Sequence, residues 1–86
     1  KYDRDSSYEV IYQVFGNSAN TFKPHKNERI ISQKDNLIKI ETIVDNEFLF
    51  IQRLLLFGAD FKIVSPDFFR EKLIDKIKLI QKGYVE

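Results

Sequence analysis

The amino-acid sequence predicts an α+β domain, a small α/β sandwich in which helices cover one face of a four-stranded, mostly antiparallel sheet. Three observations lead to this prediction. Residues 8–15 alternate between two sets of β-forming side chains, as a strand does. Residues 28–33 and 36–44 are two further β-rich segments around a short turn. Residues 54–73 end an apolar helix at a glycine, add one short strand and start a new helix.

The first half of the chain is expected to contribute three strands and a short helix. Residues 18–23 can form one or two helical turns, and Pro24 ends them because the residue before a proline avoids the α region. Residues 28–33 and 36–44 form a β-hairpin around Lys34-Asp35. The core face of its second strand is predicted to carry Ile38, Ile40, Thr42 and Val44.

The second half is expected to form a helix, a strand and a helix. Asp45-Asn46-Glu47 provides a cap and an early acid for a helix over 46–57, and Gly58 can end it in the left-handed conformation. A strand over 60–64 follows. Ser65-Pro66-Asp67 then predicts an N-cap, an N1 proline and an N2 acid for a last helix over about 66–82, which Gly83 ends.

The resulting order of elements is β, short α, β, β, α, β, α. This order resembles the ferredoxin-like split βαβ arrangement, in which two helices cover one face of the sheet. Residues 8–86 are therefore expected to form a single domain, and residues 1–7 a linker or disordered tail. Because the chain begins with Lys1 rather than methionine, we expect it to be a piece of a longer protein.

Composition narrows the classes of function. With 86 residues the chain makes one domain, and its net charge of +1 argues against a strong duplex-DNA binder acting alone. The absence of cysteine excludes disulfides and thiolate metal sites and agrees with a reducing compartment, so we expect a cytoplasmic protein. No apolar run reaches the roughly 18 residues of a membrane span.

Catalytic and metal chemistry are not expected. His25 is the single histidine, and no nucleophile motif surrounds it. One histidine without cysteine does not make a zinc site. The three glycines lie far apart, so no phosphate-binding loop is predicted. The sequence therefore predicts a non-enzymatic domain without a cofactor or metal.

A basic segment is the first candidate site. Residues 23–39 hold five lysines and arginines against two acids. One interpretation is a contact with an anionic ligand or a nucleic acid, and the other is a solvated rim of the hairpin. The candidate ligand-binding residues are Lys23, His25, Lys26 and Arg29.

The helix predicted over 46–57 is the second candidate site. Its apolar residues point in nearly every direction, and a helix that is apolar all round needs two partners. The sheet is one partner. The other is either a neighbouring domain or subunit, or the terminal helix of the same chain. The candidate interface residues are Leu49, Gln52, Arg53 and Leu56.

Several short motifs, in their order over residues 8–84, resemble the C-terminal extension of bacterial WYL-domain transcription regulators. The stretch LLLFGADFKIVSPDFFREKL (residues 54–73) is followed by IQKGY, and FKPHKNERI and VDNEFL precede it. The Trp-Tyr-Leu motif and the helix-turn-helix of that family are absent and would lie upstream of Lys1. The aromatic-acidic-aromatic start of the middle helix is only partly kept. The matching residues are Phe57-Gly58, Ile63-Val64, Ser65-Pro66, Phe69-Arg70 and Tyr84.

The resemblance implies a regulatory module with a ferredoxin-like fold. Such a module contributes to dimerisation and to sensing of an effector, in some members a nucleic-acid fragment, and its partners are the upstream WYL and helix-turn-helix domains and a second copy. The alternative is a stand-alone ferredoxin-like domain that binds a small metabolite and regulates an attached enzyme. In such domains the ligand lies near a glycine after the first strand, where this chain has Gly16-Asn17.

Overall fold

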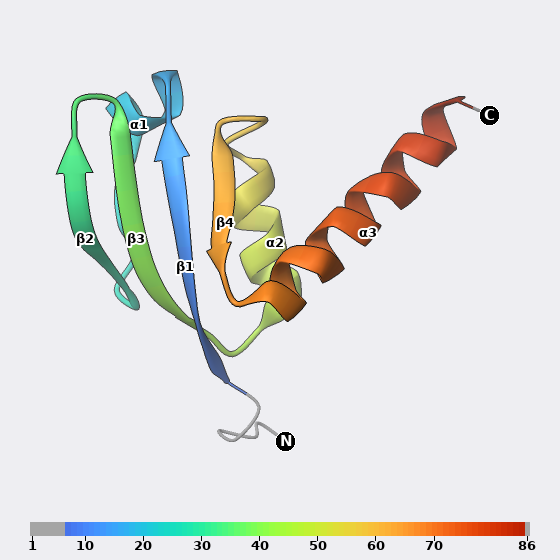
Figure 1. Cartoon of the computed structure of the whole chain (residues 1–86), viewed down its shortest axis with the longest axis horizontal. Helices are drawn as coiled ribbons and strands as arrows, with labels where there is room; N and C mark the ends of the chain where they lie inside the picture. Colours follow the sequence, from blue (N-terminus) through green and yellow to red (C-terminus); the bar gives the residue numbers. More distant parts are fainter. Residues whose placement is uncertain (1–6, 86) are drawn as a thin grey trace.

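The computed structural model describes residues 7–85 and contains the predicted elements in the predicted order (Figure 1). Of the expected tail over residues 1–7, all but Ser7 lies outside the described residues. The elements are β1 (Tyr8–Phe15), α1 (Asn17–Thr21), β2 (Glu28–Lys34), β3 (Leu37–Val44), α2 (Glu47–Leu55), β4 (Phe61–Ser65) and α3 (Asp67–Val85).

The four strands form one sheet in the order β2-β3-β1-β4, and every neighbouring pair is antiparallel. The α+β class is confirmed, and this strand order is compatible with the ferredoxin-like arrangement. The predicted hairpin is formed by β2 and β3, with Asp35 and Asn36 as its turn. Asp35 has a φ of 54°, a conformation that aspartate tolerates better than most residues, and this explains how the turn forms without a glycine.

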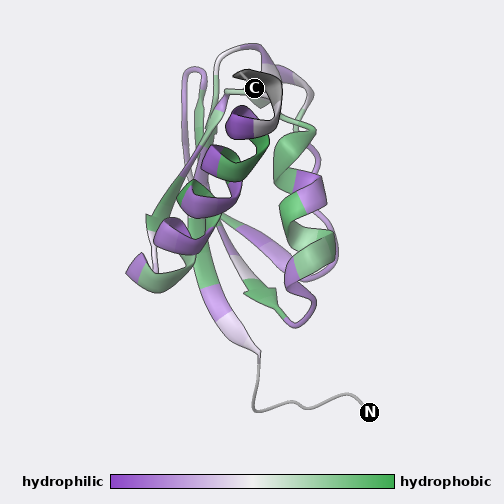
Figure 2. Ribbon diagram, turned by 90° about the vertical axis from the view of Figure 1, so that its right-hand side faces the viewer, coloured by the Kyte–Doolittle hydropathy of each residue, from purple (hydrophilic) through white to green (hydrophobic). Residues whose placement is uncertain are grey.

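The two faces of the sheet differ sharply. The inner face is packed against α2 (Figure 2), and it carries the predicted core residues of β3, all of which are buried. The outer face carries the alternate side chains of β1 and β3. The main inner-face residues are Val10, Tyr12, Val14, Ile38, Ile40, Thr42, Val44 and Ile63. The outer-face residues of the two central strands are Glu9, Ile11, Gln13, Phe15, Leu37, Lys39, Glu41 and Ile43.

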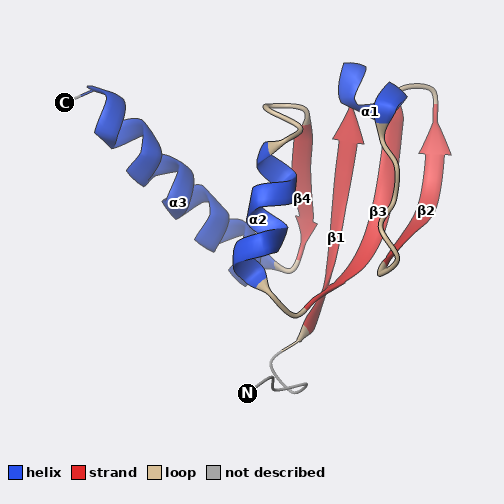
Figure 3. Ribbon diagram, turned by 180° about the vertical axis from the view of Figure 1, so that it is seen from behind, coloured by secondary structure: helices blue, strands red, loops and turns tan. Residues whose placement is uncertain are grey.

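The connection from β1 to β2 contains very little helix. The segment predicted to have one or two helical turns forms α1, which has five residues, and the chain then runs without regular structure to β2. Seen from behind, α1, this connection and α2 lie on the same side of the sheet (Figure 3). Because α1 is so short, no described helix packs along α2 on the β2 side of the inner face.

Helix α2 begins where its local sequence predicts, but it ends at Leu55, two residues before the predicted end. The side-chain oxygen of Asn46 accepts a hydrogen bond from the backbone N–H of Leu49 at 3.1 Å, which caps the N-terminus. Gly58 adopts a φ of 64° in the turn that follows the helix. The left-handed conformation costs a glycine little, so the chain can reverse there and enter β4.

Helix α3 differs from the prediction at both ends. The Pro66 carbonyl accepts a hydrogen bond from the Arg70 N–H at 3.1 Å, so the helix begins at Asp67, and the predicted Ser65 N-cap is wrong because Ser65 ends β4. The prediction that Gly83 ends the helix is also wrong, since α3 continues to Val85. Gly83 does not take a positive φ, and without the left-handed conformation a glycine does not end a helix.

Only the beginning of α3 packs against the rest of the domain. Phe69 and Leu73 are buried, and the Phe69 ring lies 5.5 Å from the ring of Phe50 on α2. The same apolar stripe continues through Ile77 and Ile80, which are exposed. The helix therefore projects away from the sheet over its second half (Figure 1).

Candidate functional site

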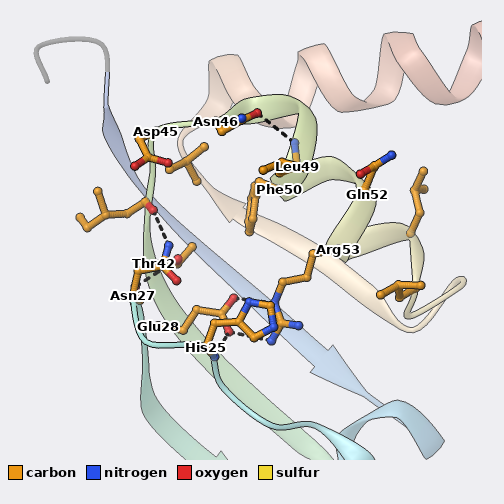
Figure 4. A pocket seen from close by; sticks show the side chains of 14 residues that line it. His25, Asn27, Glu28, Thr42, Asp45, Asn46, Leu49, Phe50, Gln52 and Arg53 are labelled. Carbon is orange, nitrogen blue, oxygen red and sulfur yellow. Dashed lines mark hydrogen bonds and ion pairs between the residues drawn. The ribbon is translucent and has the colours of Figure 1, made fainter. Parts of the chain in front are cut away.

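A groove runs beside α2 on the inner face of the sheet, where α1 is too short to cover it. Its volume is about 750 Å³, within the range of ligand-binding pockets. One wall is α2, the other is the segment His25–Glu28, and the end of β3 forms the floor (Figure 4). The lining residues are His25, Asn27, Glu28, Thr42, Ile43, Val44, Asp45, Asn46, Leu49, Phe50, Gln52, Arg53, Leu55 and Leu56.

An ion pair between Arg53 and Glu28 joins the two walls. The Arg53 Nε lies 2.9 Å from Glu28 Oε2 and its Nη2 lies 2.7 Å from Oε1, so the guanidinium binds the carboxylate with two hydrogen bonds. The Glu28 side chain is 2% exposed and the Arg53 side chain 15%. Charges this buried are tolerated because each has a partner.

Two more donors complete the environment of Glu28. The hydroxyl of Tyr12, on the buried face of β1, donates to Glu28 Oε2 at 2.6 Å. The backbone N–H of His25 donates to Glu28 Oε1 at 2.8 Å. The carboxylate thus connects β1, α2 and the 22–27 segment at one point in the groove.

The guanidinium of Arg53 also fixes the segment before β2. It lies 5.4 Å from the centre of the Phe22 ring and 5.6 Å from that of Phe57, distances at which aromatic rings attract a cation. Its Nη2 donates to the backbone carbonyl of Lys23 at 2.9 Å. Arg53 therefore holds the 22–28 segment against α2 and keeps the groove walls at a fixed separation.

The ionisation of this cluster follows from its contacts. Burial alone would raise the pKa of Glu28, but the hydrogen bonds from Arg53, Tyr12 and the His25 N–H outweigh it, so the pKa falls below its ordinary value of 4.5. Burial and the bond to Glu28 raise the pKa of Tyr12 above its ordinary value of 10.0. At neutral pH Glu28 is therefore ionised and Tyr12 is a neutral donor.

These pKa shifts predict a loss of stability in acid. Because the pKa of Glu28 is lower in the folded state, the unfolded state binds its proton first as the pH falls below about 4.5. We expect the free energy of unfolding to decline as the pH falls through this range. A Glu28→Gln variant should be less stable at pH 7 and decline less steeply, which urea unfolding at pH 7, 4.5 and 3 would measure. An equal decline in both proteins would contradict the role of Glu28.

The open end of the groove is held by uncharged contacts. The Asn27 side chain donates to the Ile43 carbonyl at 2.9 Å, and the Thr42 hydroxyl donates to the Asn27 carbonyl at 3.2 Å. These bonds fix the loop before β2 to the edge of β3. On the opposite wall Leu49 and Leu56 are exposed, with Leu56 exposed to 82%. The groove thus combines a polar wall with an apolar one.

The structure brings two sets of predicted residues to the same groove. His25 from the basic segment and all four candidate interface residues line it: Leu49, Gln52, Arg53 and Leu56. Lys23 and Lys26 are exposed on the same loop, so their predicted contact with a ligand stays a prediction. Arg29 does not line the groove, because it pairs with Glu41 on the outer face of the sheet; with Lys26 it lines a smaller hollow of about 380 Å³.

Arg53 has a different setting from the one its sequence position suggested. It was predicted as an interface residue, but most of its side chain is engaged inside the domain with Glu28, Phe22 and Phe57. Sequence reasoning missed Glu28 and Tyr12 as parts of this site. The available signal was weak: Glu28 alternates with Ile30, which places an acid on the apolar face of a predicted strand.

Between Ser7 and Val85 no group of three or more His, Cys, Asp or Glu side chains is arranged to hold a metal ion. None of the described helices has the length and apolar character needed to cross a membrane.

Comparisons with known proteins do not assign the chain to a family. A scan against protein-family models and a search of curated proteins each found no match.

Proposed function

We propose that the domain is a non-enzymatic regulatory module, the C-terminal extension of a WYL-type transcription regulator, and that the groove beside α2 binds an anionic effector. The observation that carries the proposal is the groove itself, which has the volume of a ligand site and one polar and one apolar wall. The resemblance to the WYL regulators supports the regulatory role, and dimerisation through a second surface belongs to the same proposal.

The chemistry of the walls favours a ligand that is part anion and part apolar. Leu49 and Leu56 offer exposed apolar surface on α2. On the facing loop His25 lines the groove and offers a hydrogen-bond donor, and Lys23 and Lys26, which are exposed on the same loop but do not line the groove, supply positive charge. A short single-stranded nucleic acid combines phosphate groups with flat apolar bases, so it fits both walls.

The proposed mechanism is a shift in population. A ligand in the groove contacts both α2 and the 22–28 segment, so it favours the arrangement in which these two walls are in place. If the upstream domains bind this arrangement better than others, effector binding changes their affinity for DNA. Arg53 is central because it joins the two walls before any ligand arrives.

The proposal predicts salt-sensitive binding of a short single-stranded oligonucleotide. We expect micromolar affinity in 50 mM salt and at least several-fold weaker binding in 200 mM salt, because phosphate contacts release counterions. The Lys23→Ala, Lys26→Ala double variant should bind more weakly and depend less on salt, and Leu56→Ser should weaken binding at both salt concentrations. Fluorescence anisotropy of a labelled oligonucleotide measures each affinity.

Two controls separate the groove from charge in general. A Lys78→Ala, Lys82→Ala double variant removes the same charge from the exposed part of α3 and should bind as the unmodified domain does. Arg29→Ala tests the outer face by itself. Equal losses in the α3 control and in the loop variant would contradict a groove site, and so would no binding at high micromolar protein.

The alternative, a metabolite-binding domain attached to an enzyme, gains no support from the turn after β1. Gly16 has a φ of 65°, and a Cβ atom there would lie 3.2 Å from Asp60 Oδ2. The glycine is therefore explained by the fold of the turn and its close packing against Asp60. The groove lies near the opposite end of the sheet, beside Val44 and Asn46.

A further inference from the structure

The outer face of the sheet is uncovered within residues 7–85. Helix α2 and the connection from β1 to β2 lie on the other side, and α3 runs away from the sheet (Figures 1 and 2). Many antiparallel sheets expose one face to water, so exposure alone indicates nothing. The order of the outward side chains on β3 is more informative.

The outward side chains of β3 form a self-complementary series. In chain order they are Leu37, Lys39, Glu41 and Ile43, which is apolar, basic, acidic, apolar. Read in the opposite direction, the series becomes apolar, acidic, basic, apolar. Two copies of β3 laid face to face and antiparallel would therefore match apolar to apolar and base to acid at all four positions. Leu37 and Ile43 are 41% and 46% exposed, so both are free to make such a contact.

The charges on this face are unevenly satisfied within one copy. Glu41 is ion-paired with Arg29 at 2.5 Å, and the side chain of Glu9, which is paired with Ile43 in the sheet, reaches Glu41. The hydrogen bond to Glu41 and its negative charge raise the pKa of Glu9, as expected when two carboxylates share one cation. Lys39 has no carboxylate partner anywhere between Ser7 and Val85. Glu9 and Glu41 thus carry excess negative charge, and Lys39, the neighbouring outward residue of β3, carries a positive charge without a carboxylate partner among the described residues.

We propose that the outer face binds the outer face of a second copy of this chain across a two-fold axis. Leu37 lies against the partner's Ile43, and Lys39 pairs with the partner's Glu41, with the reciprocal contacts generated by symmetry. Each Lys39 supplies the cation that the Glu9 and Glu41 pair of the other copy lacks. This inference rests on the proposed function, which includes dimerisation, and names the surface through which the two copies associate.

The size of the face sets the expected strength of the dimer. The two central strands have eight residues each, β2 has seven and β4 has five, so at about 3.3 Å per residue and about 4.8 Å between strands the face presents roughly 450 Å² per copy, or roughly 900 Å² in all. Specific interfaces start at about this area. The isolated domain is therefore expected to dimerise weakly, and upstream domains would strengthen the association by holding two copies together.

Charge exchange tests the proposed pairing directly. Lys39→Glu places an acid against the partner's Glu41, and Glu41→Lys places a base against the partner's Lys39. Each variant alone should dimerise at least about tenfold more weakly than the unmodified domain. A one-to-one mixture should recover association, because each Lys39→Glu chain then meets a Glu41→Lys chain. Sedimentation equilibrium over a range of protein concentrations measures all four samples.

The controls address folding and general charge. Glu41→Lys also removes the pair with Arg29, so circular dichroism must show that both variants remain folded. Lys78→Glu on the exposed part of α3 should leave dimerisation unchanged. A monomeric unmodified domain, a Lys39→Glu variant that dimerises normally, or a mixture that stays monomeric would each overturn the inference. Oligonucleotide binding is measured separately on the same samples. If the domain binds the oligonucleotide but does not dimerise, only the proposed dimer surface is rejected. If it dimerises in a charge-dependent way but does not bind the oligonucleotide, only the groove is rejected.

Discussion

Replacing Arg53 with alanine is expected to lower the free energy of unfolding by about 3 kcal/mol. The Glu28 carboxylate would remain ionised and buried without its bidentate partner, and the Lys23 carbonyl and the rings of Phe22 and Phe57 would lose their contact with the guanidinium. An 86-residue domain has a total stability of roughly 4–13 kcal/mol, so this loss is a large share. Urea unfolding followed by circular dichroism measures it.

Three matched variants make the result interpretable. Gln52→Ala, at the exposed neighbouring position, should change stability by less than about 0.5 kcal/mol. Arg53→Lys should recover little, because an ammonium cannot make the two parallel bonds to Glu28. A Glu28→Gln, Arg53→Met double variant should be more stable than Arg53→Ala, since no buried charge is left unpaired. A loss in Arg53→Ala no larger than that in Gln52→Ala would show that the ion pair does not hold the groove walls together.

Replacing Phe69 with alanine is expected to cost about 4 kcal/mol. Phe69 is fully buried, and its ring contacts Phe50 on α2 and lies 6.1 Å from the ring of Tyr8 on β1. The substitution would leave a cavity where the first turns of α3 pack against the rest of the domain. We expect thermal unfolding of this variant at a much lower temperature, measured by circular dichroism.

The matched control is Ile80→Ala on the same stripe of the same helix. Ile80 is 47% exposed and lies where α3 has left the sheet, so its loss should cost less than about 1 kcal/mol. The contrast between the two positions tests whether only the first half of α3 belongs to the core. Similar costs at Phe69 and Ile80 would mean that the second half of α3 packs against the domain in solution.

The fold was predictable because local signals and periodicity agree. The alternation in β3 predicted which of its side chains face the core, and Asn46 marked the start of α2 correctly. Gly58 takes the left-handed conformation, but α2 ends before it, at Leu55. The errors have local causes. Gly83 is a helix breaker only if it turns left-handed, and the start of α3 depends on whether Ser65 continues β4, which is decided by pairing with Ile11 and not by the Ser-Pro-Asp sequence.

The candidate site was less predictable because it depends on contacts between distant segments. Glu28 and Arg53 lie 25 positions apart, and Tyr12 lies 16 positions before Glu28. No single-sequence pattern pairs such residues. The apolar excess of α2 did predict that part of its surface would lack a partner within the domain, and Leu49 and Leu56 are indeed exposed. The shortness of α1, which opens the groove, becomes meaningful only once the sheet is assembled.

The most direct test of the groove as the binding site is a two-dimensional ¹H–¹⁵N NMR titration of the domain with a short single-stranded oligonucleotide. The account predicts that the largest shift changes fall on the backbone amides of residues 25–28, 42–46 and 49–56, which surround the groove. They should be reduced in the Lys23→Ala, Lys26→Ala variant. Changes concentrated on the outer-face positions of β1 and β3, or no changes at millimolar ligand, would contradict it.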